Sequence, residues 1–237
     1  MPVDVETLAM SLRSFVRRYK TQFQRLSDRK SQLLEIGALM IAAQHYDLCG
    51  YTVTLHNLRK GNIRVKLGTR GDPWNFSRFE AVGEYGSFEI HTNLPVTDAL
   101  GTEGARYVAD IVVVPAGAVP RSALGDGAKW LDLPNTDLVT FIEAKALVIY
   151  PMLIAQFIGI VHELKPEFLK GKRPPGFLAA KHFDPALVSL GYLHGTCKNI
   201  VGGFEGRKLY IRVVDEFDRA IAQLSRDGAV SPLAGGP

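Results

Sequence analysis

Three charged residues lie within two apolar stretches of the chain. Asp110 is the only charge in YVADIVVVP, and Glu143 and Lys145 interrupt VTFIEAKALVI. Apolar, β-branched stretches of this kind predict strands that are buried inside a sheet. Burying a charge costs several kcal/mol unless the charge is paired or binds a ligand. These three side chains are therefore the first candidates for chemistry.

The alternation of side chains along a strand predicts which of these groups share a face. Glu143 and Lys145 are two residues apart and lie on one face of their strand. Asp110 shares a face with the valines spaced two residues on either side of it, and we expect the two acids to meet. Close carboxylates repel each other in a low dielectric, and a divalent cation relieves that repulsion. Mg²⁺ prefers oxygen ligands, and the backbone carbonyl of Ala144 can add one.

Lys145 adds an ammonium group to the two acids. An ammonium beside a metal-bound water can position the water and help to deprotonate it, or stabilise charge in a phosphorane-like transition state. Two acids, a metal and a lysine are the groups that hydrolysis of a phosphodiester bond needs. The plainer alternative is a buried ion pair of Lys145 with Glu143 or Asp110 that binds nothing.

The elements that must hold these groups follow from the hydrophobic pattern. Residues 4–27 carry an apolar stripe at helical spacing, and 28–225 read as one α/β or α+β domain with a mixed sheet flanked by helices. The Gly/Pro-rich tail, 226–237, is expected to be disordered. Within the domain we expect a helix from Ser31 to Gly50, a hairpin over 51–67, strands at SFEIHTNL and ARYVADIVVVP, a Gly/Pro-rich excursion over 115–135, the strand of Glu143, a buried helix MLIAQFIGIVHEL that Pro151 precedes, an irregular region, a strand KLYIRVVD and a short helix.

Basic residues gather in two segments. One lies between Arg13 and Lys30, and the other runs into RGDPWNFSRF, where aromatic and basic residues interleave. Lysine and arginine neutralise phosphates, and aromatic rings stack on bases. A solvated helix face and an ordinary turn are the alternatives. The candidate nucleic-acid contacts of the second segment are Arg59, Lys60, Arg64, Lys66, Arg70, Trp74 and Arg78.

The amino-acid composition and the motifs that are missing exclude several classes of protein. The net charge is +4 and 46% of residues are hydrophobic, which fits a folded domain with a polyanionic partner. No apolar run is long enough for a membrane span, and no basic, apolar leader is present. Two distant cysteines favour a reducing cytoplasm. The sequence has no Walker loop, no G-x-S-x-G elbow and no H-x-x-x-H pair, and Glu89 and His91 are expected to form a surface pair.

Asp110 followed by Glu143-Ala144-Lys145 resembles the PD-(D/E)XK nuclease superfamily, the restriction-endonuclease-like fold, over about residues 28–215. The resemblance implies a core of a helix, three strands, a helix and a strand. It implies that a glutamate on the first helix, here Glu35, supports the site. A glutamine on the helix after the E-x-K motif, here Gln156, is implied close to the substrate backbone or the site. The alternative is that Gln156 only bonds to backbone within a buried helix. Two departures are Ala109, where the family has proline, and the 32 residues between the two acids, which indicate an insertion.

The resemblance implies a Mg²⁺-dependent nuclease, with Mn²⁺ as an expected substitute, that acts on double-stranded DNA in restriction, defence or repair. Asp110, Glu143 and the carbonyl of Ala144 would hold the metal, and Lys145 would orient the attacking water. A homodimer or a larger defence complex is expected. Two alternatives are a catalytically silent relative that binds nucleic acid and a protein-interaction or assembly subunit.

Overall fold

The structure is a computed structural model, and it describes residues 30–122 and 132–215. The helix expected over 4–27, the basic segment that begins at Arg13, the short helix after residue 215 and the tail over 226–237 lie outside the described residues, apart from Lys30 at the end of that basic segment. Among the described residues, no helix is both long and apolar enough to cross a membrane.

In the described part of the chain, seven strands form one mixed sheet whose spatial order follows the chain order. Each of the pairs from β1–β2 to β4–β5 is antiparallel, whereas β6 pairs parallel with β5 and β7 pairs parallel with β6. The mixed sheet that the sequence predicts is therefore confirmed. The strands are β1 (Thr52–His56), β2 (Arg78–Gly83), β3 (Gly86–Thr97), β4 (Arg106–Pro115), β5 (Thr140–Lys145), β6 (Ala186–Ser189) and β7 (Arg212–Val214).

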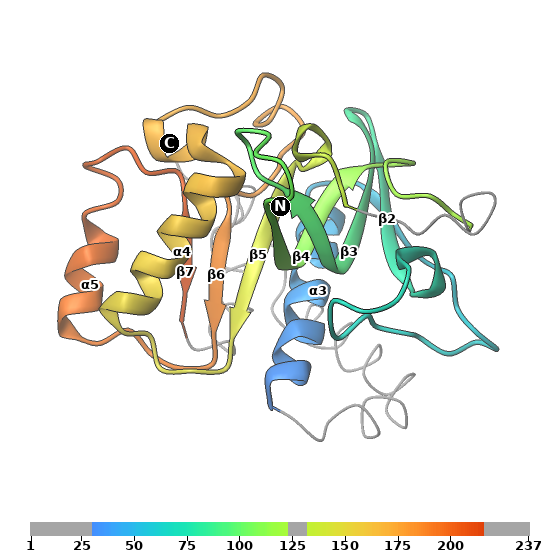
Figure 1. Ribbon diagram of the computed structural model, residues 1–237, viewed down its shortest axis with the longest axis horizontal. Coiled ribbons are helices and arrows are strands. Elements are labelled where there is room, and N and C mark those ends of the chain that lie inside the picture. The colour runs from blue at the N-terminus through green and yellow to red at the C-terminus, as the bar shows by residue number, and fades with distance from the viewer. Residues whose placement is uncertain (1–29, 123–131, 216–237) are drawn as a thin grey trace.

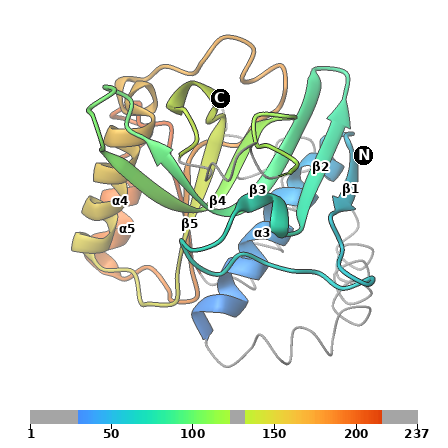
Figure 2. The same cartoon turned by 45° about the vertical axis from the view of Figure 1, so that its right-hand side comes forward.

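Helices cover both faces of this sheet (Figures 1 and 2). Helix α3 (Lys30–Leu48) packs on one face, and α4 (Pro151–Leu164) and α5 (Gly195–Gly202) belong to the layer on the other. Short 3-10 turns form η1 (Pro73–Asn75), η3 (Asn135–Asp137) and η4 (Pro166–Lys170).

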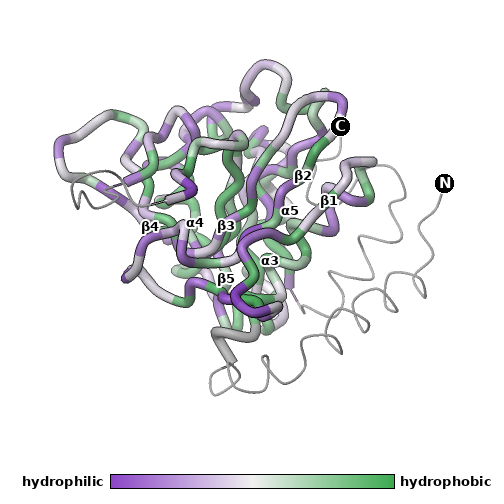
Figure 3. Tube along the Cα trace, turned by 90° about the vertical axis from the view of Figure 1, so that its right-hand side faces the viewer, coloured by the Kyte–Doolittle hydropathy of each residue, from purple (hydrophilic) through white to green (hydrophobic). Residues whose placement is uncertain are grey.

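Two hydrophobic cores follow from the alternation along the strands. On β5, Ile142 and Ala144 face α3, while Phe141 faces α4. On β4, Ile111 and Val113 belong to the first core and the valines between and after them to the second. In Figure 3 the central strands are accordingly hydrophobic and the surrounding loops more polar. Burial on both faces explains why these strands read as continuous apolar runs.

The hairpin expected over 51–67 is wrong. Strand β1 pairs with β2 instead, through partners such as Thr54 and Glu80. Residues 63–67 are not a strand; the side chain of Val65 packs against Ile36 and Met40 of α3. The segment between β1 and β2 is held by individual hydrogen bonds, and this changes the environment of the basic residues within it.

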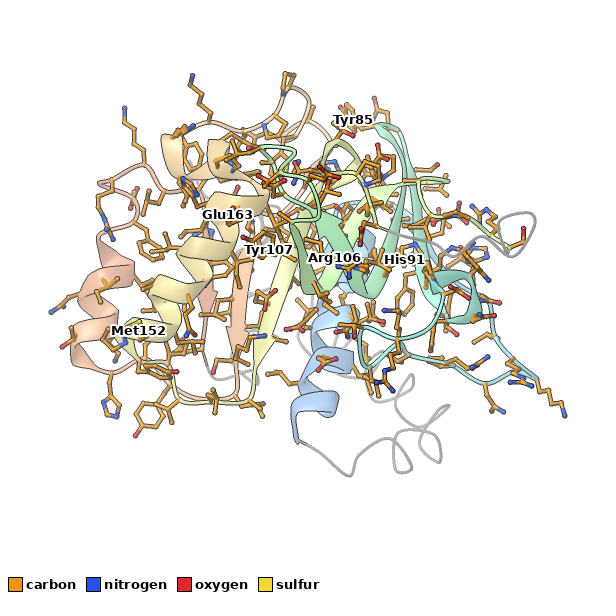
Figure 4. All side chains as sticks on the ribbon, in the orientation of Figure 1. Tyr85, His91, Arg106, Tyr107, Met152 and Glu163 are labelled. Atoms are coloured by element: carbon orange, nitrogen blue, oxygen red, sulfur yellow. The ribbon has the colours of Figure 1, made fainter. Side chains whose placement is uncertain are left out.

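Three other details differ from the prediction. Helix α4 begins at Pro151 as expected, but only one of its faces is buried. Met152, labelled in Figure 4, is 61% exposed. The region expected to be irregular contains β6, and the C-terminal strand is shorter than KLYIRVVD, since β7 covers only Arg212–Val214.

Candidate active site

The candidate site lies where β4 and β5 separate. These strands pair through three residues each, and Ile111 opposite Ile142 is the pair at the end of this ladder. Beyond that pair, β4 continues beside β3 and β5 continues beside β6. Asp110 and Glu143 are the next residues on the two strands. Both acids therefore sit at the fork, where the backbone no longer forms a ladder.

Asp110 bridges this fork. Its Oδ2 accepts a hydrogen bond from the backbone N–H of Ala144 at 2.8 Å and one from Nζ of Lys145 at 3.0 Å. The same Nζ lies 2.7 Å from Oε2 of Glu143. The structure thus brings Asp110, Glu143 and Lys145 together, as the alternation along the strands predicts.

Glu143 is the group whose hydrogen bonding is incomplete. Its side chain is 3% exposed, and its Oε1 is buried without a hydrogen-bond partner. Burial raises the pKa of this carboxyl to about 7, and the neighbouring charge of Asp110 adds to the effect. Buried polar atoms are nearly always bonded, so Oε1, which lies beside a second acid, is a candidate ligand atom for a cation.

Lys145 reaches both acids and solvent. Burial alone would lower the pKa of its amine, but the carboxylates of Glu143 and Asp110 raise it above the ordinary value. The ammonium therefore stays charged at neutral pH. Its side chain is 35% exposed, which leaves it open to a substrate.

The segment after Lys145 is fixed by its neighbours. The hydroxyl of Ser189, at the end of β6, donates to the carbonyl of Leu147. Gly191 packs against the backbone of Val148 so closely that a side chain there would overlap it. Only glycine fits at this position, and the packing holds the turn that leaves the site.

Glu35 approaches the site from α3. Its half-buried carboxylate accepts a hydrogen bond from Nδ2 of Asn93 at 2.9 Å. Burial raises the pKa of Glu35, the Asn93 bond lowers it, and the charge of Asp110 raises it further. The helix thus brings Glu35 within electrostatic reach of Asp110 and Lys145.

Gln156 does not join this group. Its side chain lies on the exposed face of α4, whereas Leu153 and Phe157 face the sheet. The expectation that Gln156 is a polar side chain inside a buried helix is wrong, because α4 is amphipathic.

The expected nucleic-acid contacts fall into two groups. Arg59, Lys60 and Arg70 are exposed, and Trp74 is half-buried in η1. Arg64 is also half-buried, with its guanidinium 5.5 Å from the centre of the Phe76 ring. All five lie in or beside the long connection between β1 and β2, residues 57–77, which we call the basic loop.

Lys66 and Arg78 require a correction, because both are buried. Lys66 is 2% exposed and Arg78 is 8% exposed. Arg78 lies 3.4 Å from Oε1 of Glu89, so its charge is directed at an internal acid. Glu89 and His91 form a buried pair at 2.9 Å and not the surface pair expected.

Asn93 is the residue near the site that sequence reasoning missed. It lies inside β3 with φ at 52°, in the left-handed region that asparagine tolerates better than most residues. An asparagine within a run of strand-forming residues was the available signal. Nothing local indicates that its amide reaches Glu35.

Comparisons of the chain with protein-family models, with curated proteins and with solved structures gave no match.

Proposed function

We propose that the protein is a metal-dependent nuclease that hydrolyses phosphodiester bonds, with double-stranded DNA as its substrate and restriction, defence or repair as its context. The observation that carries the proposal is the fork between β4 and β5, which presents the unbonded Oε1 of Glu143 beside Asp110 and Lys145. The sequence resemblance to PD-(D/E)XK nucleases assigns the same three residues. We also propose that the helices and strands around the fork form a restriction-endonuclease-like core.

The residues at the fork suit Mg²⁺ or Mn²⁺. Asp110, Glu143 and the carbonyl of Ala144 would supply oxygen ligands, and a cation would complete the coordination of Oε1. Within the described ranges, no three His, Cys, Asp or Glu side chains gather closely enough to hold a metal by themselves. Mg²⁺ is usually held by one or two carboxylates together with water and phosphate oxygens. The bound cation would generate the nucleophilic water and stabilise developing charge.

Lys145 has two roles in this proposal. Without a cation its ammonium pairs with both acids, at 2.7 Å from Glu143 and 3.0 Å from Asp110. With the acids neutralised by a cation, Lys145 is available to orient a water or to stabilise charge on the scissile phosphate. Glu35 would support the water shell from α3.

The basic loop supplies a surface for the phosphate backbone. Arg59, Lys60 and Arg70 are exposed on it, and Trp74 places an aromatic ring beside them. Contacts of this kind bind without sequence preference and weaken as salt increases. The proposal therefore predicts affinity for DNA that falls steeply between low and physiological salt.

The test is cleavage of supercoiled plasmid and linear duplex with Mg²⁺, Mn²⁺ or EDTA. Wild type should cleave with either metal and not with EDTA. Glu143→Gln and Lys145→Met should each lower the rate by about 10²-fold or more, the size of loss that follows removal of one charge-stabilising group. Glu84→Gln, which changes an exposed glutamate in the turn between β2 and β3, should cleave like wild type. Equal cleavage by wild type and Glu143→Gln would refute the proposal.

One observation favours a catalytically silent relative as the second candidate. Lys145 already pairs with both acids, as a purely structural ion cluster would. DNA binding without metal-dependent cleavage would support this candidate. No binding even at low salt would favour an assembly subunit.

A further inference from the structure

Lys66 is a buried lysine without an acidic partner among the described residues. It is 2% exposed. Its amine donates to the carbonyl of Gly68 at 2.8 Å and to that of Asn93 at 2.5 Å. Burying an ammonium is costly unless its donors are used. Both acceptors are backbone carbonyls, so the side chain fixes the path of the backbone.

Asn93 lies opposite Asp110 in the sheet. The flanking residues of β3 pair with those that flank Asp110 on β4, but Asn93 itself leaves the ladder and adopts φ of 52°. Its side-chain amide donates to Oε2 of Glu35 at 2.9 Å and to the carbonyl of Lys66 at 2.9 Å. A left-handed residue inside a strand is strained and persists only when its surroundings hold it.

These hydrogen bonds form a continuous path from the basic loop to the carboxylate of Glu35. Lys66 belongs to the loop, and its backbone N–H also donates to the hydroxyl of Thr92 on β3 at 3.2 Å. Asn93 connects Lys66 to Glu35, and Glu35 interacts electrostatically with Asp110. A shift of the loop would change the position of the Glu35 carboxylate.

We propose that Lys66 and Asn93 are positioning residues, which hold Glu35 beside Asp110 and couple the basic loop to the site. The coupling itself is a property of the fold, whereas its effect on cleavage rests on the proposed nuclease function. Substrate bound by the exposed arginines of the loop would then help to set the geometry of the site.

Two variants and one matched control test this coupling. Lys66→Met removes both amine hydrogen bonds, and Asn93→Gly removes the amide while glycine keeps the left-handed backbone. Lys165→Met is the control. Lys165 is also buried, at 8% exposed, and its amine also lies near an asparagine carbonyl, that of Asn135 at 3.4 Å. It follows the end of α4, and its side chain lies near Asn135 and Glu167, away from the residues of the fork.

Lys66→Met and Asn93→Gly should lower kcat by about 10- to 100-fold, the usual loss when a residue that orients a metal ligand is removed. KM for duplex DNA should stay within about twofold because the exposed loop residues are unchanged. Lys165→Met should lose stability but keep kcat. A kcat of Lys66→Met equal to wild type, or an equal fall for Lys165→Met, would overturn the proposal.

The side-chain amide signals of Asn93 in ¹⁵N NMR spectra give a readout that needs no cleavage. Glu35→Gln removes the charged acceptor and should move these signals, and Lys66→Met should move them in the same direction. Lys165→Met should leave them in place. If wild type fails to cleave DNA, the nuclease proposal fails, while these signals still decide the coupling. Signals that Lys66→Met leaves unmoved would overturn it.

Discussion

Asp184 and Glu143 are both buried carboxylates with a basic neighbour, and they differ in how their oxygens are used. Arg173 donates a hydrogen bond to each carboxylate oxygen of Asp184, from Nε at 2.7 Å and from Nη2 at 2.8 Å. The guanidinium of Arg173 also lies 3.6 Å from the centre of the Tyr210 ring. Only one oxygen of Glu143 is paired, and its partner, Lys145, also pairs with Asp110.

This difference shows which buried charges deserve a functional interpretation. A bidentate arginine satisfies a carboxylate completely, and such a pair is a structural unit. Burial raises the pKa of Asp184, and Arg173 opposes that rise. At the fork, burial and a second acid raise the pKa of Glu143 to about 7. An unfilled acceptor with a perturbed pKa marks a candidate site, whereas burial alone does not.

The largest expected effect is that substitutions of these two acids rank in opposite orders for loss of stability and for loss of cleavage. Asp184→Asn leaves the buried Arg173 without its charge partner and should cost about 3 to 5 kcal/mol of unfolding free energy. Glu143→Gln removes a buried charge of which one oxygen has no hydrogen-bond partner, so it should cost far less unfolding free energy. It should nevertheless lower the cleavage rate by about 10²-fold or more. Urea unfolding at pH 7 gives the stabilities. Cleavage is compared at a temperature where both variants remain folded.

Two outcomes of that experiment would break the comparison. Glu143→Gln could unfold as readily as Asp184→Asn, which would make the fork a structural ion cluster of the same kind. Alternatively, folded Asp184→Asn could lose as much cleavage as Glu143→Gln. Asp184 would then act on the site in a way that its contacts do not indicate.

The next effect concerns buried groups that stay neutral. His45, in the last turn of α3, and His182 are both buried. Nε2 of His45 lies 2.7 Å from the carbonyl of Lys181, and the hydroxyl of Tyr46 lies 2.6 Å from Nδ1 of His182. Burial lowers the pKa of His45 to about 4 and that of His182 to about 3. The unfolded chain therefore binds protons below about pH 6.5 that the folded protein does not bind.

Each of these histidines should consequently lower the unfolding free energy as pH drops from about 6.5 to 5, by up to about 1.4 kcal/mol per pH unit, whereas Glu143, whose pKa is raised to about 7, opposes this fall because its folded carboxyl takes up a proton in the same range. Urea unfolding at several pH values measures this slope. His45→Asn should reduce the histidine contribution to the slope, because one buried group with a lowered pKa is gone. An unchanged slope in that variant would show that His45 is protonated in the folded protein.

The parts of the fold that the sequence predicts are those with long, uniform patterns. Strands β4 and β5 are continuous apolar runs, α4 is a long apolar stretch that begins at Pro151, and α3 is a long apolar stretch that ends near Gly50. The partner of β1 was mistaken, because the turn Arg59–Asn62 resembles a hairpin turn while the true partner, β2, begins only at Arg78. Strand β6 has four residues, too few for a pattern.

The site residues likewise include some that the sequence predicts and others that only the fold shows. Asp110, Glu143 and Lys145 are visible in the sequence because a charge stands out in an apolar strand, and Glu35 because helical spacing turns it inward. The roles of Lys66 and Asn93 arise from where a loop without regular structure crosses β3. A basic residue in a polar loop reads as exposed, and only the fold shows that Lys66 is buried.

The smallest expected effect tests whether the exposure of the cation decides the strength of a buried pair. Glu89 is fully buried and accepts from Arg121 at 2.8 Å, as Asp184 accepts from Arg173. The side chain of Arg121 is 52% exposed, and that of Arg173 is 12% exposed.

Arg121→Ala should cost about 1 kcal/mol or less of unfolding free energy, because solvent screens its charge and Glu89 retains His91. Arg173→Met should cost several times more by urea unfolding, since Asp184 would be left buried with no partner closer than Arg212 at 3.9 Å. Equal losses would mean that the buried acid alone sets the strength of each pair, and that the exposure of its partner has no influence.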